Sequence, residues 1–146
     1  LPPPLVLAFL ATAAELVGGI FLLFGALTRL VSIPLLITML VAMFSVHAKN
    51  GWLAIADASS WLADGTIFHN QSVMEAPQKL NAAKSLLQEY GHYDWLTSSG
   101  NLVILNNGVE FAATYFVMLL VLLVYGGGRF VSVDYLISKW RSSQKS

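Results

Sequence analysis

Glu15 is the residue whose type and position in this sequence are best suited to chemistry. It is the only formally charged residue in an apolar run over residues 5–26. A carboxyl group near the centre of a bilayer costs about 2.5–3.5 kcal/mol, so we expect this side chain to face other helices or water and to have a partner. Two roles fit Glu15. It could be a protonatable group beside a quinone headgroup or in a proton path, or a protonated acid that hydrogen-bonds to a neighbouring helix, with Thr38 as the partner.

Glu110 and His47 form a second candidate site. We expect them at the same ends of two antiparallel helices, where their side chains could meet. With His69 or His92 they could form a metal site of imidazole and carboxylate type. No HxxxH or ExxH spacing supports such a site, however, and the helix dipole alone favours an acid at a helix N-terminus. We therefore predict no metal site and no catalytic residue. The residues predicted to contribute to a quinone or proton site are Glu15, Thr38, His47 and Glu110.

The composition indicates a membrane protein. Hydrophobic residues make up 56% of the 146 residues and charged residues 11%, whereas about a quarter of a soluble domain is charged. The net charge is zero, so no overall field attracts nucleic acid. The chain has no cysteine, which excludes disulfides, thiol redox chemistry and ligation of iron–sulfur clusters by this chain. Any redox role must use a bound molecule or a partner.

Three apolar runs predict an all-α integral membrane protein with a single membrane domain over residues 1–146. The predicted spans are residues 5–26, 30–47 and 109–125. About 20 apolar residues, at 1.5 Å per residue, cross a hydrocarbon core of about 30 Å. A short turn at Thr28-Arg29 makes the first two spans antiparallel.

Residues 49–108 are predicted to form an extramembrane insert, because charged and aromatic residues appear there together. Within it, residues 72–90 are predicted to form one amphipathic helix. Ser72 and Glu75 resemble a capping box at its start, and Gly91 is the expected C-cap. Its apolar stripe is Leu80, Ala83, Leu87 and Tyr90.

A second amphipathic helix is predicted to begin near Ser132 in the tail, residues 129–146. Leu136 and Trp140 would face lipid, and Lys139 and Arg141 would face phosphates. The tail carries four basic residues against one acid, whereas the insert carries three lysines against five acids. By the positive-inside rule the tail is therefore cytoplasmic and the insert is exoplasmic, which means periplasmic in a bacterium.

Four stretches of the sequence resemble the DoxX family of small bacterial inner-membrane proteins. They are AAELVGG at residues 13–19, LTRL at 27–30, NGVEF at 107–111 and GGGRFVSVD at 126–134. The resemblance implies a four-helix membrane bundle whose first helix would precede Leu1, with both termini cytoplasmic. The long insert departs from shorter members of the family. Members are associated with quinol-oxidase or thiosulfate:quinone oxidoreductase assemblies.

These observations predict a multi-pass protein of the bacterial inner membrane that serves as an accessory subunit of a quinone-linked redox assembly. Its partners would be membrane lipid and other membrane or periplasmic subunits, without nucleic acid. The chain has no phosphate loop after a strand and no nucleophile elbow, so a non-catalytic subunit is favoured over a self-contained enzyme. Two alternatives remain: a proton-linked carrier of small molecules or ions, and a structural scaffold whose insert recruits a periplasmic partner.

Overall fold

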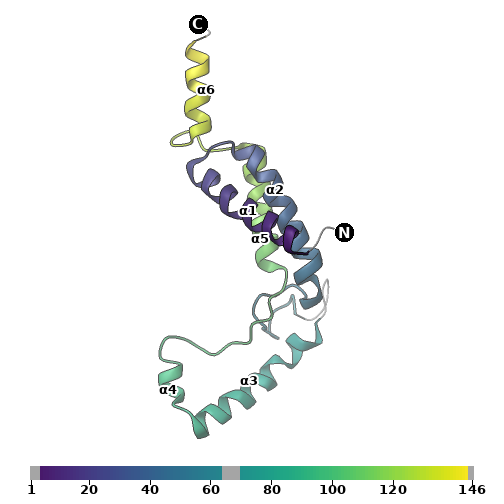
Figure 1. Cartoon of the computed structure of the whole chain (residues 1–146). Helices are drawn as coiled ribbons and strands as arrows, with labels where there is room; N and C mark the ends of the chain where they lie inside the picture. The colour runs from purple at the N-terminus through teal and green to yellow at the C-terminus, as the bar shows by residue number, and fades with distance from the viewer. Residues whose placement is uncertain (1–3, 64–69, 145–146) are drawn as a thin grey trace. The chain divides into compact units, whose positions relative to one another are not determined.

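The computed structural model describes residues 4–63 and 70–144, and these ranges are mainly helical (Figure 1). The only β-type pairing in them is an isolated antiparallel bridge between Ile55 and Leu105. The predicted all-α class is thus confirmed. The elements are α1 (Pro4–Phe24), α2 (Thr28–Val41), η1 (Ala42–His47), η2 (Ala48–Asn50), α3 (Gln71–Tyr90), α4 (Tyr93–Leu96), α5 (Glu110–Tyr125) and α6 (Val133–Ser143).

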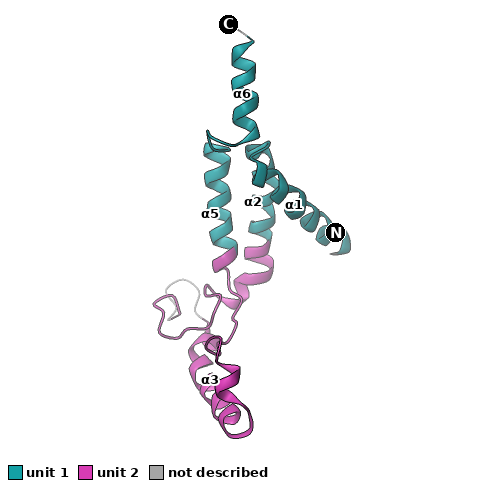
Figure 2. Ribbon diagram, turned by 90° about the vertical axis from the view of Figure 1, so that its left-hand side faces the viewer, with its two compact units in different colours: residues 1–41, 112–146 teal, residues 42–111 magenta. Residues whose placement is uncertain are grey.

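The chain forms two compact units, which are coloured separately in Figure 2. Unit 1 comprises Leu1–Val41 and Ala112–Ser146, and unit 2 comprises Ala42–Phe111. Unit 1 contains α1, α2, α6 and nearly all of α5. Unit 2 contains the predicted insert together with the residues that flank it.

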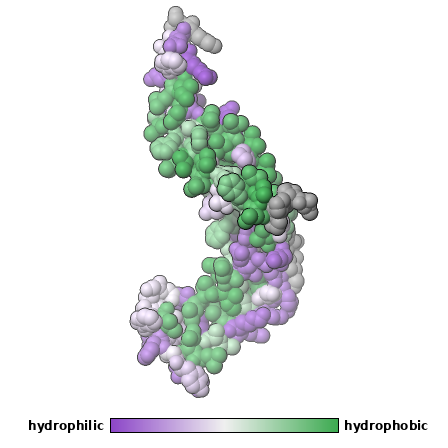
Figure 3. Space-filling view, viewed as in Figure 1, coloured by the Kyte–Doolittle hydropathy of each residue, from purple (hydrophilic) through white to green (hydrophobic). Residues whose placement is uncertain are grey.

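Two helical stretches are long and apolar enough to cross a membrane, Leu5–Phe24 and Thr28–Asn50. In an 18-residue apolar window of each stretch, only 6% and 17% of the window is buried within the protein. A core helix of a soluble protein is mostly buried. Figure 3 shows the hydrophobic surface that results. Helix α5 is apolar but has only 16 residues, which is about 24 Å at 1.5 Å per residue. The first two predicted spans are therefore supported, whereas the third span and a four-helix bundle are not confirmed.

The turn between the first two spans lies earlier than predicted. Helix α1 ends at Phe24, and Thr28 and Arg29 already belong to α2. The turn is formed by residues 25–27, where Gly25 and Leu27 have φ of 62° and 49°. Glycine adopts such a conformation readily, and other residues do so at a cost. The chain can therefore reverse within three residues.

Helices α2 and α5 share the small apolar core of unit 1. Leu35, Leu36 and Leu119 are its buried residues, and half-buried residues such as Phe116 pack against them. Helix α1 approaches α2 at Gly18, where an added Cβ would lie 3.0 Å from Leu35 Cδ1. Towards its N-terminus α1 diverges from α2 (Figure 2). One side of α1 consequently has no partner among the described residues of unit 1.

In unit 2, residues 51–56 pair with residues 104–110, and we call these two segments the paired loops. The Ala56 amide donates to Ile104 O at 2.9 Å, and the Gly108 amide donates to Leu53 O at 2.9 Å. A Cβ at Gly108 would lie 2.5–2.6 Å from three backbone carbonyl oxygens, so the pairing requires glycine there. Buried Leu53, Ala63 and Val73 form a small core beside the paired loops.

Helix α3 begins differently from the prediction. Asn70 is its N-cap and accepts a hydrogen bond from the Ser72 amide at 2.9 Å, so the predicted capping box at Ser72 is wrong. Glu75 instead forms an ion pair with Lys79 at 2.8 Å. Gly91 is the C-cap, as predicted. Only Val73 and Ala76 of this helix are buried, because the helix extends beyond the core of unit 2.

Candidate functional site

Glu15 belongs to α1 and lies about 60° around the helix from Gly18, which packs against α2. Its side chain is exposed, and in the part of the chain that the structure describes it has no hydrogen bond or ion pair. It follows Pro4 by eleven residues, which places it about 16 Å along the helix. This distance is about half the thickness of a hydrocarbon core. The carboxyl group therefore lies at mid-span of α1 and is exposed.

Thr38 lies at the same level as Glu15. Gly18 packs against Leu35, and because the helices are antiparallel, Glu15 and Thr38 both lie one turn from this contact, in the same direction along the pair. The half-buried Thr38 hydroxyl nevertheless donates to Pro34 O of its own helix at 3.0 Å. The hydrogen bond between Glu15 and Thr38 that we considered from the sequence is not formed in this structure.

His47 and Glu110 both belong to unit 2, and the side chain of each forms a hydrogen bond to the backbone of the paired loops. His47 Nδ1 lies 2.9 Å from Asn107 O. Because a carbonyl oxygen can only accept, Nδ1 carries the proton in this contact, and Nε2 of the neutral ring is the acceptor. Glu110 Oε2 accepts a hydrogen bond from the Ala54 amide at 2.9 Å. The structure thus brings the two side chains to the same pair of segments.

Asn50 and Asn106 add further side-chain hydrogen bonds to this site. Asn106 Nδ2 donates to Asn50 O at 2.6 Å and to Leu53 O at 2.7 Å. Asn50 Nδ2 donates to Asn107 O at 3.0 Å, so this carbonyl is shared with His47. The network holds His47 and Glu110 in fixed places at the ends of apolar helices.

The described residues contain no group of three or more His, Cys, Asp or Glu side chains that could hold a metal ion. His69, which we considered as a ligand, lies outside the described residues. His92 is exposed and precedes α4 as its N-cap residue without a side-chain cap.

Sequence reasoning missed a cluster in unit 1 where α6 meets the turn between α1 and α2. Asp134 Oδ1 accepts from the Leu27 amide at 2.7 Å, and Oδ2 accepts from the Thr28 amide at 2.8 Å. The Asp134 amide donates to Gly25 O at 3.0 Å. We call this set of hydrogen bonds the Asp134 clasp. It caps the N-terminus of α2 with a carboxylate, which the helix dipole favours.

The pKa of Asp134 reflects this environment. Partial burial raises the pKa of the carboxyl, but the hydrogen bonds from Thr28 and Leu27 outweigh burial and hold it below its usual value. The carboxylate is therefore stabilised in its charged form. It belongs to the framework of unit 1, because both oxygens already serve the backbone at the start of α2.

Arg29 and Ser132 extend the clasp to the other helix ends of unit 1. Arg29 Nη2 donates to Val124 O in the last turn of α5 at 2.9 Å, and Ser132 caps α6 by accepting from the Tyr135 amide. A Cβ at Gly25 would lie 2.5 Å from Ser132 Cβ, so only glycine allows this approach. The stretches LTRL and GGGRFVSVD, which are far apart in sequence, are thus parts of one structure.

Comparison with known proteins gives one match. The DoxX family model matches residues 1–48, which is consistent with a DoxX family protein and confirms the resemblance over this part of the chain. The matched range contains AAELVGG and LTRL, whereas NGVEF and GGGRFVSVD lie outside it. No curated protein and no solved structure gives a match. The match and the two apolar helices together indicate a small membrane protein that contacts lipid.

Proposed function

We propose that this DoxX-type protein is an accessory subunit of a quinone-linked redox assembly in the bacterial inner membrane. The match over residues 1–48 and the two apolar helices support the membrane location. The chain has no cysteine, and its described residues contain no metal-binding cluster. In such an assembly, a partner or a bound quinone supplies the redox-active group and this chain supplies binding groups.

The observation that carries the proposal is the exposed carboxyl of Glu15 at mid-span of α1. A carboxyl group that faces lipid costs about 2.5–3.5 kcal/mol, and a polar partner removes much of this cost. Burial against a partner favours the protonated acid, which can donate a hydrogen bond to a quinone carbonyl. The neighbouring surface suits a close approach, because a Cβ added at Gly19 would meet no atom within 4 Å.

The remaining predicted site residues have supporting parts in this proposal. Thr38 provides a hydroxyl at the level of Glu15, and His47 provides Nε2 for a proton at the end of the membrane-spanning stretch. Glu110 holds the paired loops through the Ala54 amide. We propose that the insert is periplasmic and that the C-terminal tail is cytoplasmic, in line with their charges.

Mild-detergent extraction of the tagged protein tests the proposal. We expect the wild-type protein to co-purify with a redox subunit. We also expect more than half an equivalent of quinone per chain, measured by liquid chromatography. Glu15→Leu keeps a side chain of similar size but removes the hydrogen-bond donor, and we expect it to retain at most a fifth of the quinone. Glu89→Leu is the matched control, because Glu89 is exposed on α3 outside the apolar helices. A solitary wild-type protein without quinone contradicts the proposal.

A scaffold role has one observation in its favour, which is the exposed apolar surface of α3 and α4. Leu86, Tyr90 and Trp95 are 60%, 79% and 75% exposed. A periplasmic protein partner that covers this surface would explain it. In that case Leu86→Gln with Tyr90→Ser abolishes association with the partner, whereas Glu15→Leu leaves it unchanged. The opposite pattern favours the quinone-linked role.

A further inference from the structure

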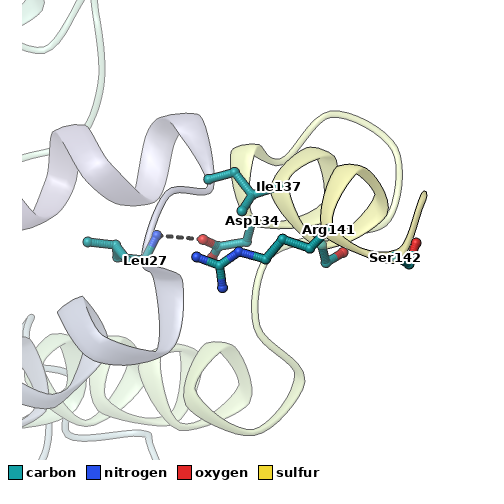
Figure 4. A pocket seen from close by; sticks show the side chains of 6 residues that line it. Leu27, Asp134, Ile137, Arg141 and Ser142 are labelled. Atoms are coloured by element: carbon teal, nitrogen blue, oxygen red, sulfur yellow. Dashed lines mark hydrogen bonds between the residues drawn. The ribbon is translucent and has the colours of Figure 1, made fainter. Parts of the chain in front are cut away.

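A cavity of about 530 Å³ lies in unit 1 between α6 and the turn that precedes α2. Its walls are Leu27, Asp134, Ile137, Ser138, Arg141 and Ser142. Figure 4 shows the Arg141 guanidinium extending from α6 towards Asp134 and Leu27, with Ile137 on the adjacent wall. The cavity therefore combines an apolar surface with one cationic group, Arg141, and one carboxylate, Asp134.

Within the described part of the chain, the charges around this cavity leave Arg141 without an ion-pair partner. Asp134 is the only acid in the cavity walls, and both of its oxygens accept from backbone amides of residues 27 and 28. Among the described residues the only ion pair is between Lys79 and Glu75, in unit 2. The walls thus hold one cation and one anion, and the Arg141 guanidinium keeps its donors outside any ion pair among the described residues.

The hydroxyls of Ser138 and Ser142 already donate hydrogen bonds within α6, so Arg141 is the donor for an anion in this cavity. Ser138 Oγ donates to Tyr135 O and Ser142 Oγ donates to Lys139 O, each at 2.8 Å. A hydroxyl has one proton to donate, so neither serine can donate to an anion without breaking its bond to the helix. The guanidinium has five donors in a planar fork, which suits the oxygens of a phosphate.

The rest of α6 indicates where this cavity lies relative to lipid. Leu136, Ile137 and Trp140 are 56%, 42% and 62% exposed and share one side of the helix. Arg141 is on the adjacent side, and the exposed aromatic Phe130 precedes the helix. An apolar side flanked by cations is the pattern of a helix at a membrane interface.

We propose that this cavity binds the headgroup of one anionic phospholipid. The phosphate is held by the Arg141 guanidinium, and the glycerol and the first acyl carbons lie along Leu27 and Ile137. Positive charge that faces a negative headgroup, next to an apolar wall that faces acyl chains, gives the complementarity on which the assignment rests. The site is independent of the quinone-linked function and uses none of its residues.

Native mass spectrometry of the full chain tests this site. The protein is released from bilayers that contain equal amounts of phosphatidylglycerol and phosphatidylcholine, and the retained lipids are counted. We expect one phosphatidylglycerol per wild-type chain. Arg141→Gln is expected to weaken its retention about fivefold, as for loss of one basic group at a lipid surface. Arg141→Lys keeps the charge and should restore part of the binding.

Lys139→Gln is the matched control, because it removes the same charge from the same helix. Lys139 is two residues from Arg141, about 200° around the helix, and does not line the cavity. We expect less than a twofold effect. Equal losses for the two variants would show diffuse attraction and overturn the site. Displacement by millimolar glycerol 3-phosphate would show that the ligand is a free phosphate, which also overturns the lipid assignment.

Discussion

The substitution Asp134→Asn tests whether the Asp134 clasp stabilises unit 1. The wild-type carboxylate accepts from the Leu27 and Thr28 amides at 2.7 and 2.8 Å. Asparagine has one acceptor oxygen, so one of these two amides loses its partner. The variant also removes the negative charge at the N-terminus of α2.

The expected loss of stability follows from these two changes. A hydrogen bond to a charged group contributes about 1.5–3 kcal/mol, and an acid at a helix N-terminus contributes about 0.3–1 kcal/mol. Asp134 is only partly buried, so the lower end of each range applies. We expect Asp134→Asn to lower the free energy of unfolding by about 2 kcal/mol. For a chain of this size that corresponds to a decrease in Tm of about 6 °C.

Thermal unfolding in detergent, followed by circular dichroism, measures this change. Asp94→Asn is the control, because Asp94 is exposed and belongs to the single turn of α4. We expect the control to shift Tm by less than about 1 °C. Equal shifts for the two variants would refute the reasoning, because they would mean that the two amide hydrogen bonds add no stability.

The pH dependence gives an independent check on the same residue. The pKa of Asp134 is lowered from 3.8 in the folded protein, so its stabilising contribution is present above pH 3.8 and is lost as the pH falls through the folded pKa. The difference in stability between wild type and Asp134→Asn should therefore be constant near neutral pH and shrink below pH 3.8. A difference that grows in acid would contradict the assignment.

Three further changes test the packing of the two units. Gly108→Ala places a Cβ within 2.6 Å of three carbonyl oxygens; we expect a cost of about 3 kcal/mol and rapid proteolysis of unit 2, whereas Gly128→Ala, with open space around it, should be neutral. Gly18→Ala should destabilise unit 1 by about 1 kcal/mol in a detergent-unfolding titration, and Gly19→Ala should not. Arg29→Gln removes the hydrogen bond to the last turn of α5 and should cost about 1 kcal/mol in the same titration.

The helices were predictable where their signals are local. The apolar run before Phe24 and the apolar run after Glu110 correspond to α1 and α5, because a long uninterrupted apolar run is a local signal that favours a helix. Helix α6 begins at Val133, near the predicted start, and its cap Ser132 and the donor Tyr135 are three residues apart. The start of α3 was misplaced because Asn70 and Ser72 are both good caps, and local sequence does not decide between them.

The long-range parts of the candidate site were not predictable. Asp134 and the amides it accepts from are 106 and 107 residues apart, and an acid in the first turn of a helix is explained equally well by its own helix dipole. Ala54 and Glu110 are 56 residues apart, so no local sequence pattern indicates that the paired loops contact each other. Glu15 was identifiable from one charge in an apolar run, but its exposure depends on how α1 packs.

Photo-crosslinking from position 15 in intact membranes tests the central claim most directly. A photoreactive amino acid replaces Glu15 in one variant and Glu89 in the control variant, and the crosslinked products are identified by mass spectrometry. We expect position 15 to crosslink to a redox subunit or a quinone, and position 89 to crosslink to neither. Crosslinks from position 15 to lipid acyl chains alone would contradict the account.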